Sequence, residues 1–493
     1  MRNRTAWLVV GMVFAVVAGV TDRGLAAPAP RGNSETLNLG GRFGHVSVVR
    51  PPSGVPTTVA LLLTEGPADQ GRGAELASAL AAHGALVLGV DANAYLRSVE
   101  KSKRCAYPAG DLELLSQGYQ RHASLPEYLH PVLVGDGPGA ALVYAALAQA
   151  PPGTFRGAVS VDFSPELETS AAFCPGSGLV RTRDREGRRE RLAPARALYE
   201  PWVVLAAELD PAHTPKAARA FTQSLKTASV KEVPGPGLRR GPVEVWKGPL
   251  LAAYDMAAVP LASERLPAPQ SKLPPAASGG TVPAPPEKVD DLPLVEVPAV
   301  KPEGDTLVLL VSGDGGWASM DQHVASAMTE QGIPVVGLNS LRYFWKRRTP
   351  EEASADVARA LRHYLAAWSR QRVVLVGYSR GADVVPAIAA GLPSDLRERL
   401  RLLALIAPGK EAEFEVHVTD IFGGKGQPTH PLLPDIQALS GTPVLCLYGD
   451  EEKTESLCPD LNDVPGARSV MLKGGHHFDG DYASVARAIL QML

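Results

Sequence analysis

The chain has little net charge for its length. Its 493 residues include 49 Lys and Arg against 52 Asp and Glu, a formal net charge of −3. Proteins that bind nucleic acid through charge carry a basic excess or a basic stripe, so we expect no nucleic-acid partner. A disordered chain is also excluded, because 45% of the residues are hydrophobic. The length exceeds what one hydrophobic core usually supports, so two or more domains are expected.

Cysteine is scarce, with four residues in the whole chain. Two fall in each half, a distribution that suits disulfide bonds in an oxidising compartment. We predict that Cys105 pairs with Cys174 and Cys446 with Cys458, with four buried free thiols as the alternative. Neither a C-x-x-C nor an H-x-x-x-H spacing occurs, so we expect no metal site and no cofactor.

A long apolar run occurs only near the beginning of the chain. Arg2 and Arg4 precede the apolar residues 6–20, and residues 24–27 (GLAA) offer small side chains to signal peptidase. We therefore expect residues 1–27 to be a signal peptide that exports the protein. The apolar run is shorter than the roughly 20 residues that span a bilayer, so no integral membrane protein is expected after cleavage.

Proline is concentrated in one stretch between the two halves. Residues 263–291 interleave proline with Ala, Ser and Gly, a composition typical of a semi-rigid linker. The flanking halves, 28–262 and 292–493, resemble each other. Residues 132–140 (VLVGDGPGA) align with 374–382 (VLVGYSRGA). The sequence therefore predicts a tandem duplication of one domain.

Each half alternates short Val- and Leu-rich runs with longer Ala-rich stretches. Residues 373–376 are an example of the first pattern and 351–368 of the second. Buried strands separated by helices favour a parallel sheet that is covered on both faces. We predict an α/β fold class, with two tandem domains that are each a mostly parallel sheet with helices on both faces.

The second half contains a serine in a G-x-S-x-G motif. Residues 377–381 (GYSRG) follow the strand expected at 373–376 and precede a helix expected over 382–390. That order is typical of the nucleophile elbow of α/β hydrolases, a tight turn that exposes a serine at the start of a helix. We predict Ser379 as a nucleophile in an α/β-hydrolase-like domain.

A serine nucleophile needs a histidine to accept its proton and an acid to orient that histidine. In α/β hydrolases the chain order is serine, acid, histidine. The strand expected at 442–448 leads into three acids, and the strand expected at 469–472 leads into two glycines and two histidines. The candidates, in order of preference, are Glu452, Asp450 and Glu451 for the acid, and His476 and His477 for the base.

The oxyanion that forms on attack needs backbone N–H donors. Arg380, directly after the serine, supplies one donor. The glycine-rich turn 312–317 (SGDGGW) can supply the second through Asp314 or Gly315, with an ordinary strand-to-helix turn as the alternative.

The first half lacks the residues of this site. Gly137 stands where Ser379 stands in the second half, and Leu250 aligns with His476. We therefore expect residues 28–262 to form a degenerate, catalytically inert domain and residues 292–493 to form the catalytic one.

Three motifs of the second half, 312–317, 335–345 (VVGLNSLRYFW) and 377–386 (GYSRGADVVP), resemble the VirJ/AcvB family of bacterial virulence proteins. The duplicated layout resembles the longer, AcvB-like members. The resemblance implies an α/β-hydrolase fold, a periplasmic location, Ser379 as the nucleophile and a link to virulence and type IV secretion. For AcvB-like members it also implies hydrolysis of lysyl-phosphatidylglycerol to lysine and phosphatidylglycerol. The family usually has a bulkier apolar residue where Arg380 stands.

The implied substrate suggests roles for further residues. A lysyl group carries two ammonium charges, so we expect Asp314 and Asp383 near it, although Asp383 can instead brace the elbow. We expect Arg342, Tyr343 and Trp345 to meet an anionic lipid surface, with a partly buried lid loop as the alternative.

The leading hypothesis is thus a periplasmic serine esterase that acts on an aminoacylated phospholipid at the membrane face, with type IV secretion components as further partners. A non-catalytic adaptor for type IV secretion is the alternative. A general esterase or peptidase is the third hypothesis.

Overall fold

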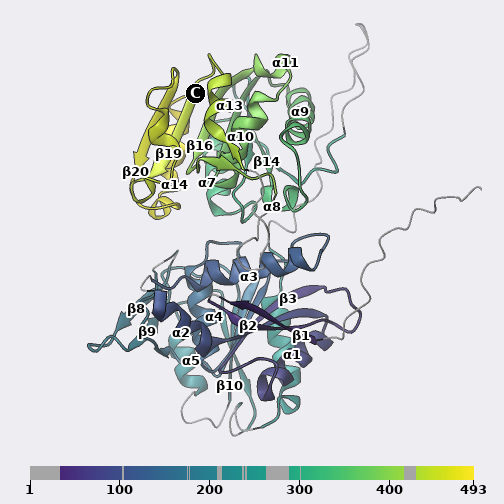
Figure 1. The fold of residues 1–493 in the computed structure, drawn as a ribbon, viewed down its shortest axis with the longest axis vertical. Helices are drawn as coiled ribbons and strands as arrows, with labels where there is room; N and C mark the ends of the chain where they lie inside the picture. The colour runs from purple at the N-terminus through teal and green to yellow at the C-terminus, as the bar shows by residue number, and fades with distance from the viewer. Residues whose placement is uncertain are drawn as a thin grey trace, which may run out of the picture.

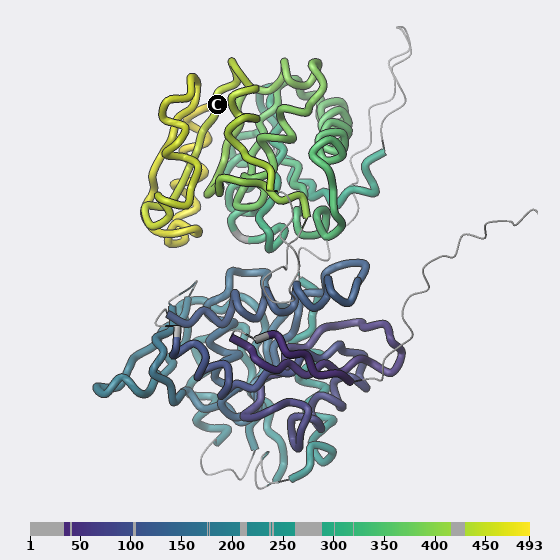
Figure 2. The backbone as a smooth tube through the Cα atoms, in the orientation of Figure 1, coloured from purple at the N-terminus to yellow at the C-terminus, as the bar shows by residue number. Residues whose placement is uncertain are grey.

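The structure is a computed structural model that describes residues 34–40, 42–102, 105–174, 176, 178–207, 214–235, 238, 241–261, 288–299, 301–415 and 429–493. The expected signal peptide and most of the expected linker lie outside these residues. The described residues form a first unit up to residue 261 and a second unit from residue 288, each built around its own large sheet (Figure 1). Figure 2 follows the chain from the first unit, in purple and teal, to the second, in green and yellow.

The first unit contains an eight-stranded sheet in the order β1-β2-β4-β3-β5-β6-β10-β11. The strands are β1 (Ser34–Gly40), β2 (Gly44–Val49), β3 (Thr58–Thr64), β4 (Ala85–Asp91), β5 (Val132–Asp136), β6 (Gly157–Val161), β10 (Trp202–Ala207) and β11 (Ala228–Val233). β2 is antiparallel to both of its neighbours, and the strands from β4 to β11 are parallel. A small separate sheet has the order β7-β9-β8, from β7 (Glu166–Glu168), β8 (Val180–Arg183) and β9 (Arg189–Ala193).

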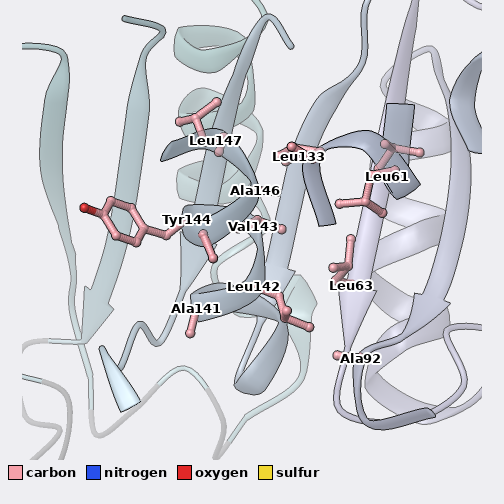
Figure 3. Close-up of a cluster of buried hydrophobic side chains, with 14 of the residues drawn as sticks. Leu61, Leu63, Ala92, Leu133, Ala141, Leu142, Val143, Tyr144, Ala146 and Leu147 are labelled. Carbon is pink, nitrogen blue, oxygen red and sulfur yellow. The ribbon is translucent and has the colours of Figure 1, made fainter. Parts of the chain in front are cut away.

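Helices cover both faces of this sheet, as the continuous apolar strands predict. They are α1 (Gly71–Ala82), α2 (Ala92–Ser102), α3 (Pro108–His122), α4 (Pro138–Gln149), α5 (Pro215–Thr222) and α6 (Lys247–Ala257), with a short 3₁₀ segment η2 (Val243–Val245). One core cluster packs beneath α2 to α5 and another beneath α1 and α6. Figure 3 shows part of the first cluster, where Leu142 of α4 lies near Leu61 and Leu63 of β3 and Leu133 of β5.

The second unit contains a seven-stranded sheet in the order β12-β14-β13-β15-β16-β19-β20. The strands are β12 (Leu294–Val297), β13 (Thr306–Val311), β14 (Val335–Leu338), β15 (Arg372–Tyr378), β16 (Leu400–Ile406), β19 (Val444–Gly449) and β20 (Ala467–Leu472). Only β12 runs antiparallel to its neighbour, β14. A two-stranded pair, β17 (Glu411–Ala412) and β18 (His430–Pro431), lies outside the main sheet.

The helices of the second unit also lie on both faces of its sheet. They are α7 (Ser319–Glu330), α8 (Ser340–Tyr343), α9 (Pro350–Ala367), α10 (Arg380–Ala390), α11 (Ser394–Arg397), α13 (Leu432–Ala438) and α14 (Tyr482–Leu490), with 3₁₀ segments η4 (Asp450–Glu452), η5 (Cys458–Leu461) and η6 (Phe478–Gly480). Two core clusters again occupy the two faces. The α/β fold class predicted from the sequence is therefore confirmed.

The start of α9 shows how local sequence sets an element. Pro350 occupies the first helical position, where its missing N–H costs nothing. The Thr349 side chain accepts from the Glu352 N–H at 3.2 Å, and the Glu352 carboxylate accepts from the Thr349 N–H at 2.9 Å. This reciprocal capping box satisfies two amides that the helix leaves without partners. The observed helix matches the stretch 351–368 expected from the sequence to within a residue at each end.

The two large sheets share one topology, as a tandem duplication predicts. The pairing of β12 with β14 repeats that of β2 with β4, and the following strands keep the same order. One disulfide lies in each unit, Cys105–Cys174 in the first and Cys446–Cys458 in the second, the same pairs that the sequence predicts. No helix in the described part of the chain has both the length and the hydropathy needed to cross a bilayer.

Candidate active site

Ser379 lies at the turn between β15 and α10. Its φ of 53° is in the left-handed region, where a non-glycine residue is strained by about 1–3 kcal/mol. The neighbouring glycines allow this turn to pack. A Cβ on Gly377 would lie 2.4 Å from the Gly381 carbonyl oxygen, and one on Gly381 would lie 2.0 Å from the Val311 carbonyl oxygen. The G-x-S-x-G pattern is thus a steric requirement of the elbow.

A histidine and a glutamate complete a hydrogen-bonded line with this serine. His476 Nε2 lies 2.8 Å from Ser379 Oγ, and His476 Nδ1 lies 2.9 Å from Glu452 Oε1. The serine follows β15, the acid lies in η4 after β19, and the histidine follows β20. These are the distances and the chain order that a serine, acid and histidine triad requires. The structure therefore brings together the first choice for each position.

The glutamate fixes the protonation of the histidine ring. An ionised carboxylate can only accept, so the hydrogen on the neutral ring of His476 resides on Nδ1 and points at Glu452. Nε2 is then free to accept the hydroxyl proton of Ser379. Burial lowers the pKa of His476, but its hydrogen bond to Glu452 and the carboxylate charge outweigh burial, so the pKa lies above its ordinary value.

The two alternative candidates support the loops of the site. Asp450 Oδ1 accepts from the Gly474 N–H at 2.8 Å, which ties the acid turn to the histidine loop. His477 Nδ1 lies 2.8 Å from the hydroxyl of Tyr378, the residue before the serine. Burial lowers the pKa of His477 to about 4, so this ring is neutral at neutral pH. Their contacts are with these neighbouring loop residues rather than with the serine.

The turn 312–317 passes directly over the elbow. A Cβ on Gly313 would lie 3.5 Å from the Ser379 Cβ. The Ser340 hydroxyl donates to the Gly313 carbonyl oxygen, and in a trans peptide the next N–H points the opposite way. The N–H of Asp314 therefore points away from Ser340, and Asp314 and Gly315 both stay candidates for the second oxyanion donor. Arg380, at the first position of α10, is placed to supply the other.

A pocket of about 560 Å³ opens at the serine. It is lined by Asp314, Ser379, Arg380, Asp383, Lys410, Glu411, Glu413, Thr429, Thr454 and Glu455. Five of these side chains are carboxylates and two are cations. The excess of acids makes the pocket suited to a positively charged group.

Both cations of the lining are engaged with other groups. The Arg380 guanidinium donates to the carbonyl oxygen of Glu413 at 3.1 Å and to that of Glu415 at 2.9 Å. Lys410 Nζ lies 2.8 Å from an Asp460 carboxylate oxygen. Arg380 is thus directed at the backbone of the segment 413–415, and the charge of Lys410 is offset by Asp460. The carboxylates therefore outweigh the cations in this lining.

Asp383 is placed for both of the roles that the sequence left open. Its Oδ1 accepts from the Gly409 N–H at 2.7 Å, which braces the turn that follows β16 against α10. It also lines the pocket with the serine. Burial raises the pKa of Asp383 to about 7, so its charge changes near neutral pH.

The aromatic and basic segment after β14 lies away from the pocket lining. Tyr343 is 2% exposed and donates to Asp356 Oδ2 at 2.7 Å. Trp345 is 4% exposed, and its Nε1 donates to the Leu125 carbonyl oxygen of the first unit at 2.8 Å. Buried rings cannot meet a lipid surface, so the predicted lipid contact is wrong for Tyr343 and Trp345. The alternative, a buried loop, fits these two residues. Arg342 is exposed.

The first unit keeps the elbow without its nucleophile. Gly137 has φ 61° and ψ −121°, close to the 53° and −122° of Ser379. The alignment of Leu250 with His476 is wrong, because Leu250 lies in α6, a helix that packs on its sheet well after the end of β11. The sequence between β11 and α6 contains no histidine, so the expectation of an inert first unit stands.

Several pocket residues carried no sequence signal. Lys410, Glu411 and Glu413 come from the segment after β16, and Thr454 and Glu455 from the segment after η4. No motif links these loops, so only the fold brings them to the serine. Over the described ranges, no cluster of three or more His, Cys, Asp or Glu side chains is placed to hold a metal ion.

Comparison with known proteins gives a family for the second unit. Residues 305–493 match the family described as "Bacterial virulence protein (VirJ)". No curated protein matches the chain.

Solved structures of similar fold include several hydrolases. MenH from S. aureus is 13% identical, with 41% of this chain and 97% of that chain covered at a TM-score of 0.32. Est1E from Butyrivibrio proteoclasticus is 13% identical, with 45% and 99% covered at a TM-score of 0.29. A lipase-esterase related protein from Clostridium acetobutylicum ATCC 824 is 14% identical, with 41% and 98% covered at a TM-score of 0.30. The family match agrees with the elbow motif and its place after β15: over residues 305–493, this chain is similar to the VirJ family of bacterial virulence proteins.

Proposed function

We propose that the second unit is a serine esterase that hydrolyses the aminoacyl ester of lysyl-phosphatidylglycerol to lysine and phosphatidylglycerol. The observation that carries the proposal is the line from Ser379 through His476 to Glu452, at 2.8 Å and 2.9 Å, at the edge of an acidic pocket. This arrangement supports acyl transfer through a covalent intermediate.

The first half of the reaction acylates the enzyme. Ser379 Oγ attacks the lysyl carbonyl carbon while His476 Nε2 accepts the hydroxyl proton. The N–H groups of Arg380 and of Asp314 or Gly315 stabilise the oxyanion. His476 then gives the proton to the glycerol oxygen, and phosphatidylglycerol leaves with lysine bound to the serine as an ester. Glu452 stabilises the imidazolium throughout.

The second half releases lysine. Water loses a proton to His476 Nε2 and attacks the acyl carbon, and the proton returns to Ser379 Oγ as the ester breaks. The carboxylates of the pocket support the choice of a lysyl group, which brings two ammonium charges. Because buried or confined charge needs a partner of opposite sign, such a group is favoured over a neutral acyl chain of the same size.

The location and the cellular role belong to the same proposal. The arginines and the apolar run at residues 2–20 support export to the periplasm, where the lipid substrate would be met at the membrane face. The family match supports a contribution to virulence, and the proposal extends this contribution to lipid balance and type IV secretion.

The test is lysine release from vesicles that contain lysyl-phosphatidylglycerol. We expect the purified protein to release lysine. The rate of release should be at least about 10³-fold lower in Ser379→Ala. Ser326→Ala, which removes an exposed serine on α7, is the matched control and should match the wild type. Activity of Ser379→Ala close to that of the wild type would refute the mechanism. In a deletion strain, full rescue by Ser379→Ala would instead favour the secretion adaptor.

A further inference from the structure

The first unit touches the second unit beside the catalytic pocket. A Cβ on Gly153 would lie 3.9 Å from the Cβ of Ala318, which directly follows the oxyanion turn. Trp345 donates to the Leu125 carbonyl oxygen at 2.8 Å, and its ring lies 5.4 Å from that of Tyr128. Figure 1 shows α3 on the side of the first unit that faces the second. The contact therefore involves α3 and the loop that follows it.

Arg121, near the end of α3, makes the most extensive of these contacts. Its guanidinium donates to the Trp345 carbonyl oxygen and forms an ion pair with Glu415. It also lies 5.4 Å from the centre of the Trp345 ring. The side chains of Arg121 and Glu415 are 22% and 19% exposed, so water screens this pair only partly.

The segment that Arg121 holds is a wall of the pocket. Glu411 and Glu413 line the pocket, and Glu415 follows them in the chain. The same segment accepts two hydrogen bonds from the side chain of Arg380, the residue after the nucleophile. Residues 411–415 are thus held between an arginine of the first unit and an arginine of the second.

The oxyanion turn also lies near α3. Asp314 lies on the oxyanion turn and lines the pocket. Burial, together with the nearby charge of Asp314, raises the pKa of Glu113, on α3, to about 8. Two residues of α3 therefore interact with the surroundings of the pocket, Glu113 with the oxyanion turn and Arg121 with the segment 411–415.

We propose that the first unit, although it lacks a nucleophile, holds one wall of the catalytic pocket in place, with Arg121 as the positioning residue that holds residues 411–415 through Glu415. This inference rests on the proposed function in one respect, since it takes Ser379 as the nucleophile. A displaced wall should weaken the binding of an acyl group that fills the acidic pocket. It should leave the attack on a small acetyl ester nearly unchanged, because that reaction needs only the triad and the oxyanion donors.

The test reverses the charges of the pair in the full-length protein. We expect Arg121→Glu to raise KM for lysine p-nitrophenyl ester about tenfold while kcat/KM for p-nitrophenyl acetate stays within about twofold. The double variant Arg121→Glu with Glu415→Arg should recover KM to within about threefold of the wild type. Arg359→Glu is the matched control, because Arg359 is 23% exposed and paired within the second unit. It should leave KM for the lysyl ester and kcat/KM for p-nitrophenyl acetate unchanged.

A second readout separates this inference from the proposed function. Amide hydrogen exchange of residues 411–415 should be faster in Arg121→Glu and slower again in the double variant. An unchanged KM in Arg121→Glu, or a double variant as impaired as the single one, would overturn the inference. If the wild type cleaves neither ester, the proposed function fails, and exchange alone decides: a charge-dependent change supports the wall, and identical exchange in all variants refutes it.

Discussion

The choice of Glu452 over Asp450 as the triad acid gives the sharpest test of the site. Glu452→Gln keeps the size of the side chain but removes its charge. The glutamine amide can donate to His476 Nδ1 across the 2.9 Å contact, which would place the ring hydrogen on Nε2, facing the serine. A ring in that tautomer cannot accept the serine proton. By analogy with the loss of a triad carboxylate elsewhere, kcat should fall about 10³- to 10⁴-fold.

The corresponding change at Asp450, Asp450→Asn, should lower kcat much less. Asp450 Oδ1 accepts from the Gly474 N–H at 2.8 Å, and the oxygen of an asparagine can accept that bond equally. Weakening one charge-assisted hydrogen bond in this way costs about 1 kcal/mol, or a factor of roughly five. Steady-state hydrolysis of a soluble lysyl ester by both variants measures the difference. Equal losses in both variants, or Glu452→Gln with more than about a tenth of wild-type kcat, would refute the assignment.

Two further predictions concern pH and stability. Burial raises the pKa of Asp383 to about 7, so the pocket loses a negative charge as the pH falls through 7, and KM for a lysyl ester should rise. Asp383→Asn should abolish this dependence of KM on pH. The same dependence in the variant and the wild type would contradict the role of Asp383. Reduction of Cys105–Cys174, which closes a loop with a sequence separation of 69, should lower the unfolding free energy by about 4 kcal/mol. Cys446–Cys458, with a sequence separation of 12, should contribute about 3 kcal/mol. Urea unfolding of the two double Cys→Ala variants measures both losses in unfolding free energy. A larger loss for Cys446–Cys458 would contradict the dependence on loop length.

Local signals in the sequence were sufficient for the fold class and for the elbow. Strands such as β15 are continuous apolar runs, and the glycines around Ser379 are required by backbone contacts as close as 2.0 Å. The triad acid was harder to identify from the sequence. Asp450 and Glu452 lie on one 3₁₀ segment, where successive side chains point about 120° apart. A difference of two residues then decides which carboxylate faces His476, and spacing alone does not reveal it.

The aromatic segment could not be placed from the sequence. Tryptophan is common at membrane surfaces, so its residue type suggests a membrane-facing role for Trp345. Its partners, Leu125 and Arg121, lie more than two hundred residues earlier in the chain. The same holds for the pocket walls at Glu413 and Glu455, which come from separate loops. Tertiary contacts of this kind follow from how the two units dock, and no local pattern encodes them.

The glycine at the elbow of the first unit has a consequence for how such a duplicate evolves. A serine in this turn holds a backbone conformation that disfavours every residue with a side chain by about 1–3 kcal/mol, and the enzyme tolerates that strain for the sake of its nucleophile. Gly137 adopts the same angles freely. On the proposal that the first unit is inert, a copy released from catalysis becomes more stable by the substitution that disables it, so the loss of activity and the greater stability of the scaffold arise from the same change.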